Sequence, residues 1–321
     1  MSSSGIKVLL IDVDSTIPNL ALMKISAYHK SKGDEVGFNV NDPDKVYASV
    51  IFKKNRHLVD GLQFYYPHAE IDIGGSGYDL KKVLPDEIER MTPDYDLYPE
   101  CDRYYGFTTR GCIRHCPFCI VPKKEGKFRR LYSSPLWALE SITGFRQKYD
   151  QICFLDNNIL ADKEWFLDLA EHLAQLGKKV DFNQGLDIRL VDKDIAKALA
   201  KLKPINDWKF AFDSMGYREE VLRGIRILRD AGIDTKCRCI FYVYCDSDEQ
   251  YDDAVERMRI LKENRASAYV MLNMDAPKTP RMARLKRWSR PWLFWSIDID
   301  QYCRGGVESM FEIRIPEVVC A

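Results

Sequence analysis

The chain has 321 residues, of which 46% are apolar and 30% charged, proportions typical of a protein with a buried core. Lys plus Arg and Asp plus Glu number 48 each, so the formal net charge is zero, which argues against a global attraction to nucleic acid or anionic membranes. No apolar run approaches the ~20 residues that span a bilayer. Because residues 1–5 also lack the pattern of a secretory signal, we expect a cytoplasmic protein with no membrane partner.

The N-terminal third alternates short apolar strands with a helix. The apolar segment Lys7–Val13 predicts a buried strand, and Pro18 and Gly33 mark the expected start and end of a helix. Three further strands are expected at Glu35–Phe38, Val46–Phe52 and Glu70–Ile73. This alternation favours a small doubly wound, Rossmann-like domain over residues 1–98.

From Tyr104 onward the strand and helix alternation has a longer period. Strands are expected at Gly106–Arg110, Gln151–Leu155, Lys179–Asn183, Lys209–Phe212, Lys236–Tyr244 and Ala268–Asn273. The helical patterns between them cover Pro135–Lys148, Lys163–Leu176, Lys193–Leu202, Glu219–Ala231 and Glu249–Glu263. The sequence therefore predicts an α/β protein with a partial (β/α)6 TIM-like barrel over residues 99–275, a C-terminal helical extension over residues 276–321, and chemistry at the carboxyl ends of the strands.

Ten cysteines in a cytosolic chain are not expected to form a disulfide framework. Three of them, Cys112, Cys116 and Cys119, lie within eight residues that follow a predicted strand and a glycine. Cysteine thiolates are the usual ligands of Fe–S clusters. Three ligands on a four-iron cluster leave one iron open, and an open coordination position is what distinguishes a catalytic metal site from a structural one.

This Cys-x3-Cys-x2-Cys spacing after the first barrel strand, with aromatic Phe118 before the last cysteine, resembles the signature of radical S-adenosylmethionine (SAM) enzymes. The resemblance covers residues 104–274. It implies that the three cysteines hold a [4Fe–4S] cluster and that its open iron binds SAM. It further implies a reducing partner such as flavodoxin or ferredoxin, and reductive cleavage of SAM to a 5′-deoxyadenosyl radical that acts on an unknown substrate. Whether SAM serves as cofactor or cosubstrate is not indicated.

The resemblance also suggests SAM contacts at the ends of the barrel strands. Asp156 or Asn157 would accept from the SAM ammonium group, Arg189 would clamp its carboxylate, and Gln184 would bond nearby. Asp213 and Ser214 would meet the ribose hydroxyls, and Phe118 would pack near adenine. The alternative is that these polar residues are helix caps or surface groups. The family's Gly-Gly-Glu stretch is replaced here by Asp156-Asn157-Asn158, and the usual glycine of the fifth strand is not evident.

The N-terminal domain resembles the cobalamin-binding domain of one subclass of the family. The segment Asp12–Thr16 lacks the histidine of that subclass's Asp-x-His-x-x-Gly motif, so cobalamin is disfavoured and a degenerate domain is expected. Methylthiotransferases carry three further cysteines in their N-terminal domain, whereas no cysteine here precedes Cys101. That activity is disfavoured too.

Other classes stay open at this point. The three thiolates, with or without His115, would form a zinc or Fe–S staple in a non-catalytic scaffold, although zinc sites usually show paired Cys-x2-Cys hooks. An auxiliary cluster is conceivable at Cys237, Cys239, Cys245 or Cys303, with buried structural thiols as the favoured alternative.

A nucleic-acid-modifying enzyme is suggested by the basic and aromatic stretch 281–292. The favoured alternative there is a helix that packs Met282, Leu285 and Trp288 or Ser289 against the barrel.

Overall fold

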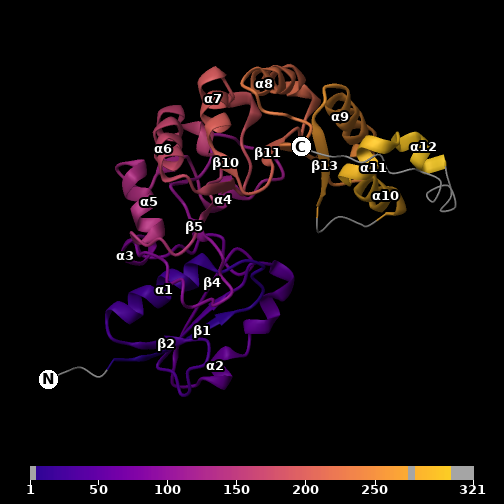
Figure 1. The fold of residues 1–321 in the computed structure, drawn as a ribbon. Helices are drawn as coiled ribbons and strands as arrows, with labels where there is room; N and C mark the ends of the chain where they lie inside the picture. Colours follow the sequence, from indigo (N-terminus) through magenta and orange to yellow (C-terminus); the bar gives the residue numbers. More distant parts are fainter. Residues whose placement is uncertain (1–4, 274–278, 305–321) are drawn as a thin grey trace. The chain divides into compact units, whose positions relative to one another are not determined.

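The computed structural model describes residues 5–273 and 279–304, with side chains to residue 302 (Figure 1). Contacts divide the chain into two units, Met1–Asn157 and Asn158–Ala321. Both units combine parallel β-strands with helices, so the predicted mixed α/β class is confirmed. The division falls between two consecutive asparagines inside the segment predicted as one barrel, and the expected boundaries near residues 98 and 275 stay predictions.

The first unit starts with a parallel sheet in the order β2-β1-β3-β4. Its strands are β1 (Lys7–Asp12), β2 (Glu35–Gly37), β3 (Lys45–Ser49) and β4 (Glu70–Gly74), close to the predicted ranges. Successive side chains of a strand point to opposite faces. Leu9 and Val46, neighbours in the sheet, are buried on one face, and Val8 and Leu10 on the other.

Helices cover both faces of this sheet. Figure 1 shows α1 (Leu20–Ser31) and α2 (Leu62–Tyr65) on opposite sides of β1. The 3-10 helix η1 (Lys53–Val59) precedes α2, and Val59 and Leu62 are buried with Ala48 of β3. Helix α1 begins after Asn19, whose side chain accepts from the backbone N–H groups of two residues in the first turn. The sheet thus has the two-sided cover expected of a doubly wound domain.

The rest of the first unit contains β5 (Tyr104–Gly106), which pairs in parallel with β8 (Gln151–Phe154). The expected strand 106–110 is broken after Gly106, and its end forms a separate strand, β6 (Thr109–Arg110). The remaining elements of this unit are α3 (Asp86–Glu89), α4 (Val121–Lys124), β7 (Arg129–Arg130) and α5 (Pro135–Thr143). Helix α5 ends earlier than predicted because Gly144 adopts the left-handed conformation, φ +59°.

The second unit repeats helix and strand. Its first elements are η2 (Ile159–Ala161), α6 (Lys163–Leu176), β9 (Lys179–Phe182), η3 (Ile188–Leu190), α7 (Lys193–Lys201) and β10 (Lys203–Pro204). They are followed by β11 (Trp208–Ala211), η4 (Met215–Tyr217), α8 (Arg218–Asp230), β12 (Cys239–Cys245), η5 (Asp248–Gln250), α9 (Tyr251–Glu263) and β13 (Ser267–Leu272). Strands β11, β12 and β13 form a parallel sheet in that order.

Strand β12 starts three residues later than expected. The carboxylate of Asp234 accepts from the backbone N–H groups of Lys236 and Cys237 at 2.9 and 3.4 Å, which holds these residues in a turn. Within β12 the odd-numbered side chains are buried and the even-numbered ones partly exposed. The alternation is that of a strand with one covered face.

Three short helices follow, α10 (Pro280–Trp288), α11 (Pro291–Ser296) and α12 (Ile299–Arg304). Met282, Leu285 and Trp288 are at most 1% exposed. The predicted burial of these three side chains is therefore confirmed. None of the helices among the described residues combines the length and apolar character required to cross a bilayer.

Candidate functional site

The three clustered cysteines lie on a loop that is closed at its base. Strand β6 before the loop pairs antiparallel with β7 after it, Arg110 opposite Arg129. The backbone N–H of Cys112 donates to the carbonyl of Gly126 at 3.4 Å. The cysteines are therefore presented by a closed hairpin loop, called the cysteine loop below, residues 111–128.

Asp156 fixes the chain where it enters this loop. Its side chain is buried and accepts from the N–H and hydroxyl groups of Thr108 at 3.1 and 2.7 Å, and from those of Thr109 at 2.6 Å each. Burial raises the pKa of Asp156, and the four donors oppose that rise. Because these residues turn toward Asp156, the expected strand breaks at this point. The carboxylate predicted to meet the SAM ammonium group thus serves the backbone of the loop entrance.

Asn157 holds the next part of the entrance. Its Oδ1 accepts from the backbone N–H of Gly111 at 3.0 Å. Gly111 has φ +76°, and a Cβ placed on it would lie 2.3 Å from the carbonyl oxygen of Lys127. Only glycine fits this close approach of the two sides of the loop.

The three cysteine side chains of the loop are each partly exposed, whereas Cys101, Cys153, Cys239 and Cys245 are buried. Backbone N–H groups point at two of the sulfurs. The N–H of Arg114 donates to Sγ of Cys112 at 3.3 Å, and that of Val121 donates to Sγ of Cys119 at 3.5 Å. Such N–H···S bonds stabilise thiolates and tune the potential of Fe–S clusters.

The loop offers thiols as its donor groups. Within residues 5–273 and 279–302, no three His, Cys, Asp or Glu side chains gather around one point fit for a metal ion. A four-iron cluster takes each thiolate on a separate iron. His115 is exposed beside Cys116. Three partly exposed thiols on a closed loop, two of them with backbone N–H donors, are the type of ligand that a cluster would use.

A largely buried group of charges ties the cysteine loop to the N-terminal elements of its own unit. Arg110 contacts Glu89 at 2.7 Å and Glu125 at 3.2 Å. Lys24 of α1 forms an ion pair with Glu89 at 3.4 Å. Burial raises the pKa of Glu89, but Lys24 and Arg110 outweigh it and hold that pKa below its ordinary value. Arg110, just before the loop, and Glu125, near its end, carry opposite charges, and their pairing stabilises the base of the loop.

The loop also touches the turn after β4. Nζ of Lys124 donates to Oγ of Ser76 at 2.7 Å. Ser76 lies in the glycine-rich turn Gly74–Gly77, where a Cβ on Gly75 would meet the Val50 carbonyl at 2.2 Å. Close backbone packing therefore explains Gly75 and Gly77, where a Cβ would also lie 2.6 Å from the backbone of Phe52.

Polar groups at the carboxyl edge of the N-terminal sheet form hydrogen bonds with one another. Parallel sheets of this class usually bind ligands there. The carboxylate of Asp14 accepts from the backbone N–H groups of Ile51 and Phe52 at 2.7 and 2.9 Å, and from Nδ2 of Asn55 at 2.9 Å. The disfavoured cobalamin prediction stays a prediction.

The second unit brings several of the predicted SAM contacts together. Arg189 forms a bidentate pair with Asp187, Nε to Oδ1 2.6 Å and Nη2 to Oδ2 3.1 Å. Its guanidinium lies 4.6 Å from the centre of the Tyr217 ring, and the Tyr217 hydroxyl accepts from the backbone N–H of Asp213 at 2.6 Å. Burial raises the pKa of Asp213, opposed by donation from the Tyr244 N–H and by nearby Arg257 and Arg189. These groups follow β9 and β11 at their carboxyl ends.

The other predicted contacts are more peripheral. Gln184 and Ser214 are exposed, and Ser214 caps η4 by accepting from the Gly216 N–H at 3.1 Å. Phe118 is 42% exposed. Sequence reasoning missed Tyr217, which has no motif of its own. The sequence indicates Tyr217 only through its position, four residues after the predicted ribose contact Asp213.

The remaining described cysteines show no grouping. Cys239 and Cys245 are at most 1% exposed, and burial raises the pKa of both thiols. Cys245 Sγ lies 3.6 Å from the sulfur of Met282. Buried thiols in apolar surroundings are ordinary core residues. The side chain of Cys303 lies outside the described part of the chain.

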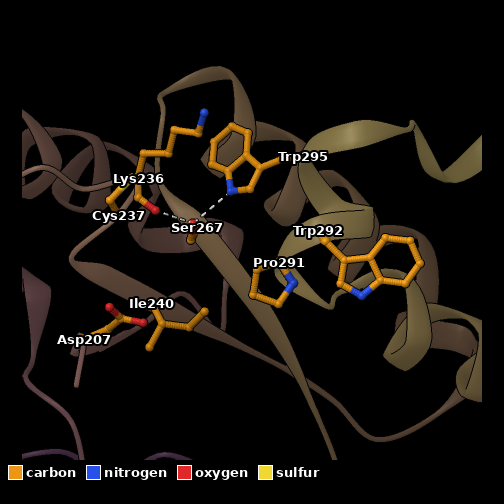
Figure 2. A pocket seen from close by; sticks show the side chains of 8 residues that line it. All are labelled: Asp207, Lys236, Cys237, Ile240, Ser267, Pro291, Trp292 and Trp295. Carbon is orange, nitrogen blue, oxygen red and sulfur yellow. Dashed lines mark hydrogen bonds between the residues drawn. The ribbon is translucent and has the colours of Figure 1, made fainter. Parts of the chain in front are cut away.

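A cavity of about 390 Å³ lies at the opposite, amino ends of β11, β12 and β13 (Figure 2). Asp207 precedes β11, Ser267 begins β13, and Trp295 belongs to α11. Trp295 Nε1 donates to Oγ of Ser267 at 3.0 Å, and that Oγ donates to the carbonyl of Lys236 at 2.6 Å. None of the predicted SAM contacts lines this cavity.

Comparison with models of known protein families and with curated proteins gave no match to this chain.

Proposed function

We propose that this chain is a radical SAM enzyme in which Cys112, Cys116 and Cys119 hold a [4Fe–4S] cluster. One arrangement carries the proposal: three partly exposed thiols on a loop closed by β6 and β7, two of them bonded by backbone N–H groups. A reduced cluster, when bound, supplies the electron that cleaves SAM to methionine and the 5′-deoxyadenosyl radical. We extend the proposal to a partial (β/α)6 barrel built on the strands from β5 to β13.

The protein's own residues have definable tasks in this proposal. The three cysteines supply the thiolates and leave the fourth position open. The N–H groups of Arg114 and Val121 stabilise negative charge on sulfur. Asp156 and Asn157 hold the loop entrance through Thr109 and Gly111.

The predicted SAM contacts in the second unit have tasks of their own. Arg189 already binds Asp187 in a bidentate pair, so a SAM carboxylate would compete with Asp187 for the guanidinium. Asp213 is held by the Tyr244 N–H at 2.9 Å and would offer its other oxygen to a ribose hydroxyl. We propose reductive cleavage of SAM as the class of reaction and assign no substrate.

The test is anaerobic reconstitution with iron and sulfide, followed by dithionite reduction with SAM. The unmodified chain should hold four iron and four sulfide per chain at the loop, change its electron paramagnetic resonance spectrum on adding SAM, and release 5′-deoxyadenosine. Cys112→Ala, Cys116→Ala and Cys119→Ala should each lose these properties. Cys237→Ala is the matched control, since this partly exposed cysteine lies outside the loop.

Two outcomes would contradict the proposal. Bound zinc without iron or sulfide would indicate a structural staple. A cluster whose spectrum never responds to SAM would indicate an electron-carrying or structural role.

A further inference from the structure

We propose that the N-terminal domain binds single-stranded nucleic acid through a basic–aromatic surface made of Lys53, Lys54, Arg56, Leu58, Phe64 and Tyr65. All six side chains are exposed, and they come from η1 and α2. The inference does not depend on the cysteine loop, and it names a binding activity beyond the radical chemistry proposed above.

The aromatic residues of this surface are unusually open to solvent. Phe64 is 85% exposed, Tyr65 74% and Leu58 58%. The two rings stand nearly perpendicular, with centroids 5.8 Å apart and an interplanar angle of 85°. Large apolar side chains grouped on a surface mark interaction sites. Exposed aromatic rings are what unpaired bases stack on.

The helix η1, which lies shortly before α2 in the chain, carries concentrated positive charge. Lys53, Lys54 and Arg56 occupy three of four consecutive positions, and Asp60 is the sole acidic residue between residues 53 and 65. The whole chain is neutral, so this cluster is a local departure that favours an anionic partner. Nearby rings orient two of the cations: Arg56 lies 4.8 Å from the Tyr78 ring centre and Lys54 5.9 Å from that of Phe52.

The surface is held on a firm base. Asp14 accepts from the N–H groups of Ile51 and Phe52 and from Asn55, which fixes the start of η1. Val59 and Leu62 are buried in the core beneath. With these residues anchored inward, the exposed side chains are displayed outward in a defined arrangement, and less ordering entropy is lost on binding.

Nucleic acid fits this arrangement better than a lipid surface does. Membrane-surface helices present a continuous apolar face along several turns, whereas α2 has only four residues. The Phe64 and Tyr65 rings stand nearly perpendicular to each other, so they cannot both lie flat in one membrane interface. The basic stretch 281–292, which the sequence suggested for nucleic acid, differs because Trp288 is fully buried and Arg281 pairs with Asp252 at 2.6 Å.

The test uses the full chain and fluorescence anisotropy with labelled 15-nucleotide oligouridine, oligodeoxythymidine and a duplex of equal length. Binding of both single strands should exceed that of the duplex. Phe64→Ala with Tyr65→Ala should weaken single-strand binding roughly 10- to 100-fold, the loss expected when bases lose stacking partners. Comparison of the two single strands distinguishes RNA from DNA, and either result supports the surface.

Charge is tested separately. Lys53→Gln, Lys54→Gln and Arg56→Gln together should reduce the slope of log K against log salt by about 2, because three phosphate contacts each contribute roughly 0.7. Two matched controls should bind normally: Trp137→Ala with Phe145→Ala removes exposed rings elsewhere. Lys193→Gln, Lys197→Gln and Lys201→Gln removes three exposed cations from α7.

The proposal is overturned if the surface variants bind single strands like the unmodified chain, or if the chain binds none. Binding to phosphatidylserine vesicles that is lost in the Phe64→Ala, Tyr65→Ala variant, without oligonucleotide binding, would assign the surface to lipid and overturn it too. Cys116→Ala should retain full oligonucleotide binding, so failure of the cluster proposal and failure of this one are distinguishable.

Discussion

Nη2 of Arg110 lies 2.7 Å from Oε1 of Glu89, and both side chains are more than four-fifths buried. Arg110 directly precedes the cysteine loop, and Glu89 is the last residue of α3. The pair therefore joins the loop base to the N-terminal part of the first unit, and four predictions follow from the loop and its supports.

Arg110→Gln should destabilise the protein. The substitution leaves Glu89 and Glu125 without their common partner in largely buried surroundings. Breaking a buried ion pair in this way costs about 3 kcal/mol of unfolding free energy, measurable by urea denaturation. Arg103→Gln is the matched control, because its partner Asp102 is 59% exposed, and a surface pair is worth less than about 1 kcal/mol. Equal losses for both variants would argue against the buried network.

Glu89 should make the unfolding free energy depend on acid pH. Its pKa lies lower in the folded protein than the ordinary value of 4.5, so the unfolded chain binds the proton more readily. The contribution of Glu89 is therefore fully present above about pH 4.5 and is lost as pH falls through the lower, folded pKa. Urea titrations between pH 6 and 3 should show a shallower decline for Glu89→Gln. An unchanged decline would assign the acid sensitivity to other carboxylates.

Gly111→Ala should distort the cysteine loop. The added methyl would lie 2.3 Å from the carbonyl oxygen of Lys127, and the residue keeps φ +76°. Gly126→Ala is a close control, since Gly126 has φ +74° with open space around its Cβ position. We expect about 1 kcal/mol of backbone strain at Gly126 and a larger loss at Gly111. The iron and sulfide content after reconstitution should fall in the Gly111→Ala variant alone. An equal fall in both variants would mean that the backbone conformation of the glycine, and not its contact with Lys127, determines whether the loop holds a cluster.

Asp156 and Thr109 should be energetically coupled. The buried carboxylate accepts both the N–H and the hydroxyl of Thr109 at 2.6 Å, and hydrogen bonds to charged groups are worth about 1.5–3 kcal/mol. A double-mutant cycle of Asp156→Asn and Thr109→Val should give a coupling energy in that range. The cycle of Asp156→Asn with Thr143→Val should be additive within about 0.5 kcal/mol, because the Thr143 hydroxyl donates to Leu139 in its own helix. Additivity in both cycles would refute the assigned bond.

The strands of the N-terminal sheet and most helices could be predicted because their signals are local. Apolar alternation marks β1 and β3, and Gly177 ends α6. The spacing of the three cysteines likewise identifies from the sequence alone the segment expected to hold a cluster. The apolar pattern predicts a longer helix than α5 because that pattern continues past Gly144, where the helix ends.

What only the tertiary structure decided is how the loop is held. Asp156 accepts a hydrogen bond from Thr108, which lies 48 residues earlier in the sequence, and Arg110 donates to Glu89, 21 residues earlier. The hydrophobic pattern of the sequence does not predict which distant carboxylate will accept a hydrogen bond from a given N–H or hydroxyl group. That pairing depends on burial and on which strands become neighbours in the fold. The break in the expected strand 106–110 has the same cause, since the pull of Asp156 on two backbone amides outweighs the local preference of threonine for extended structure. The sequence by itself determined the chemistry offered by three thiols; packing determined the charges and amides that surround them.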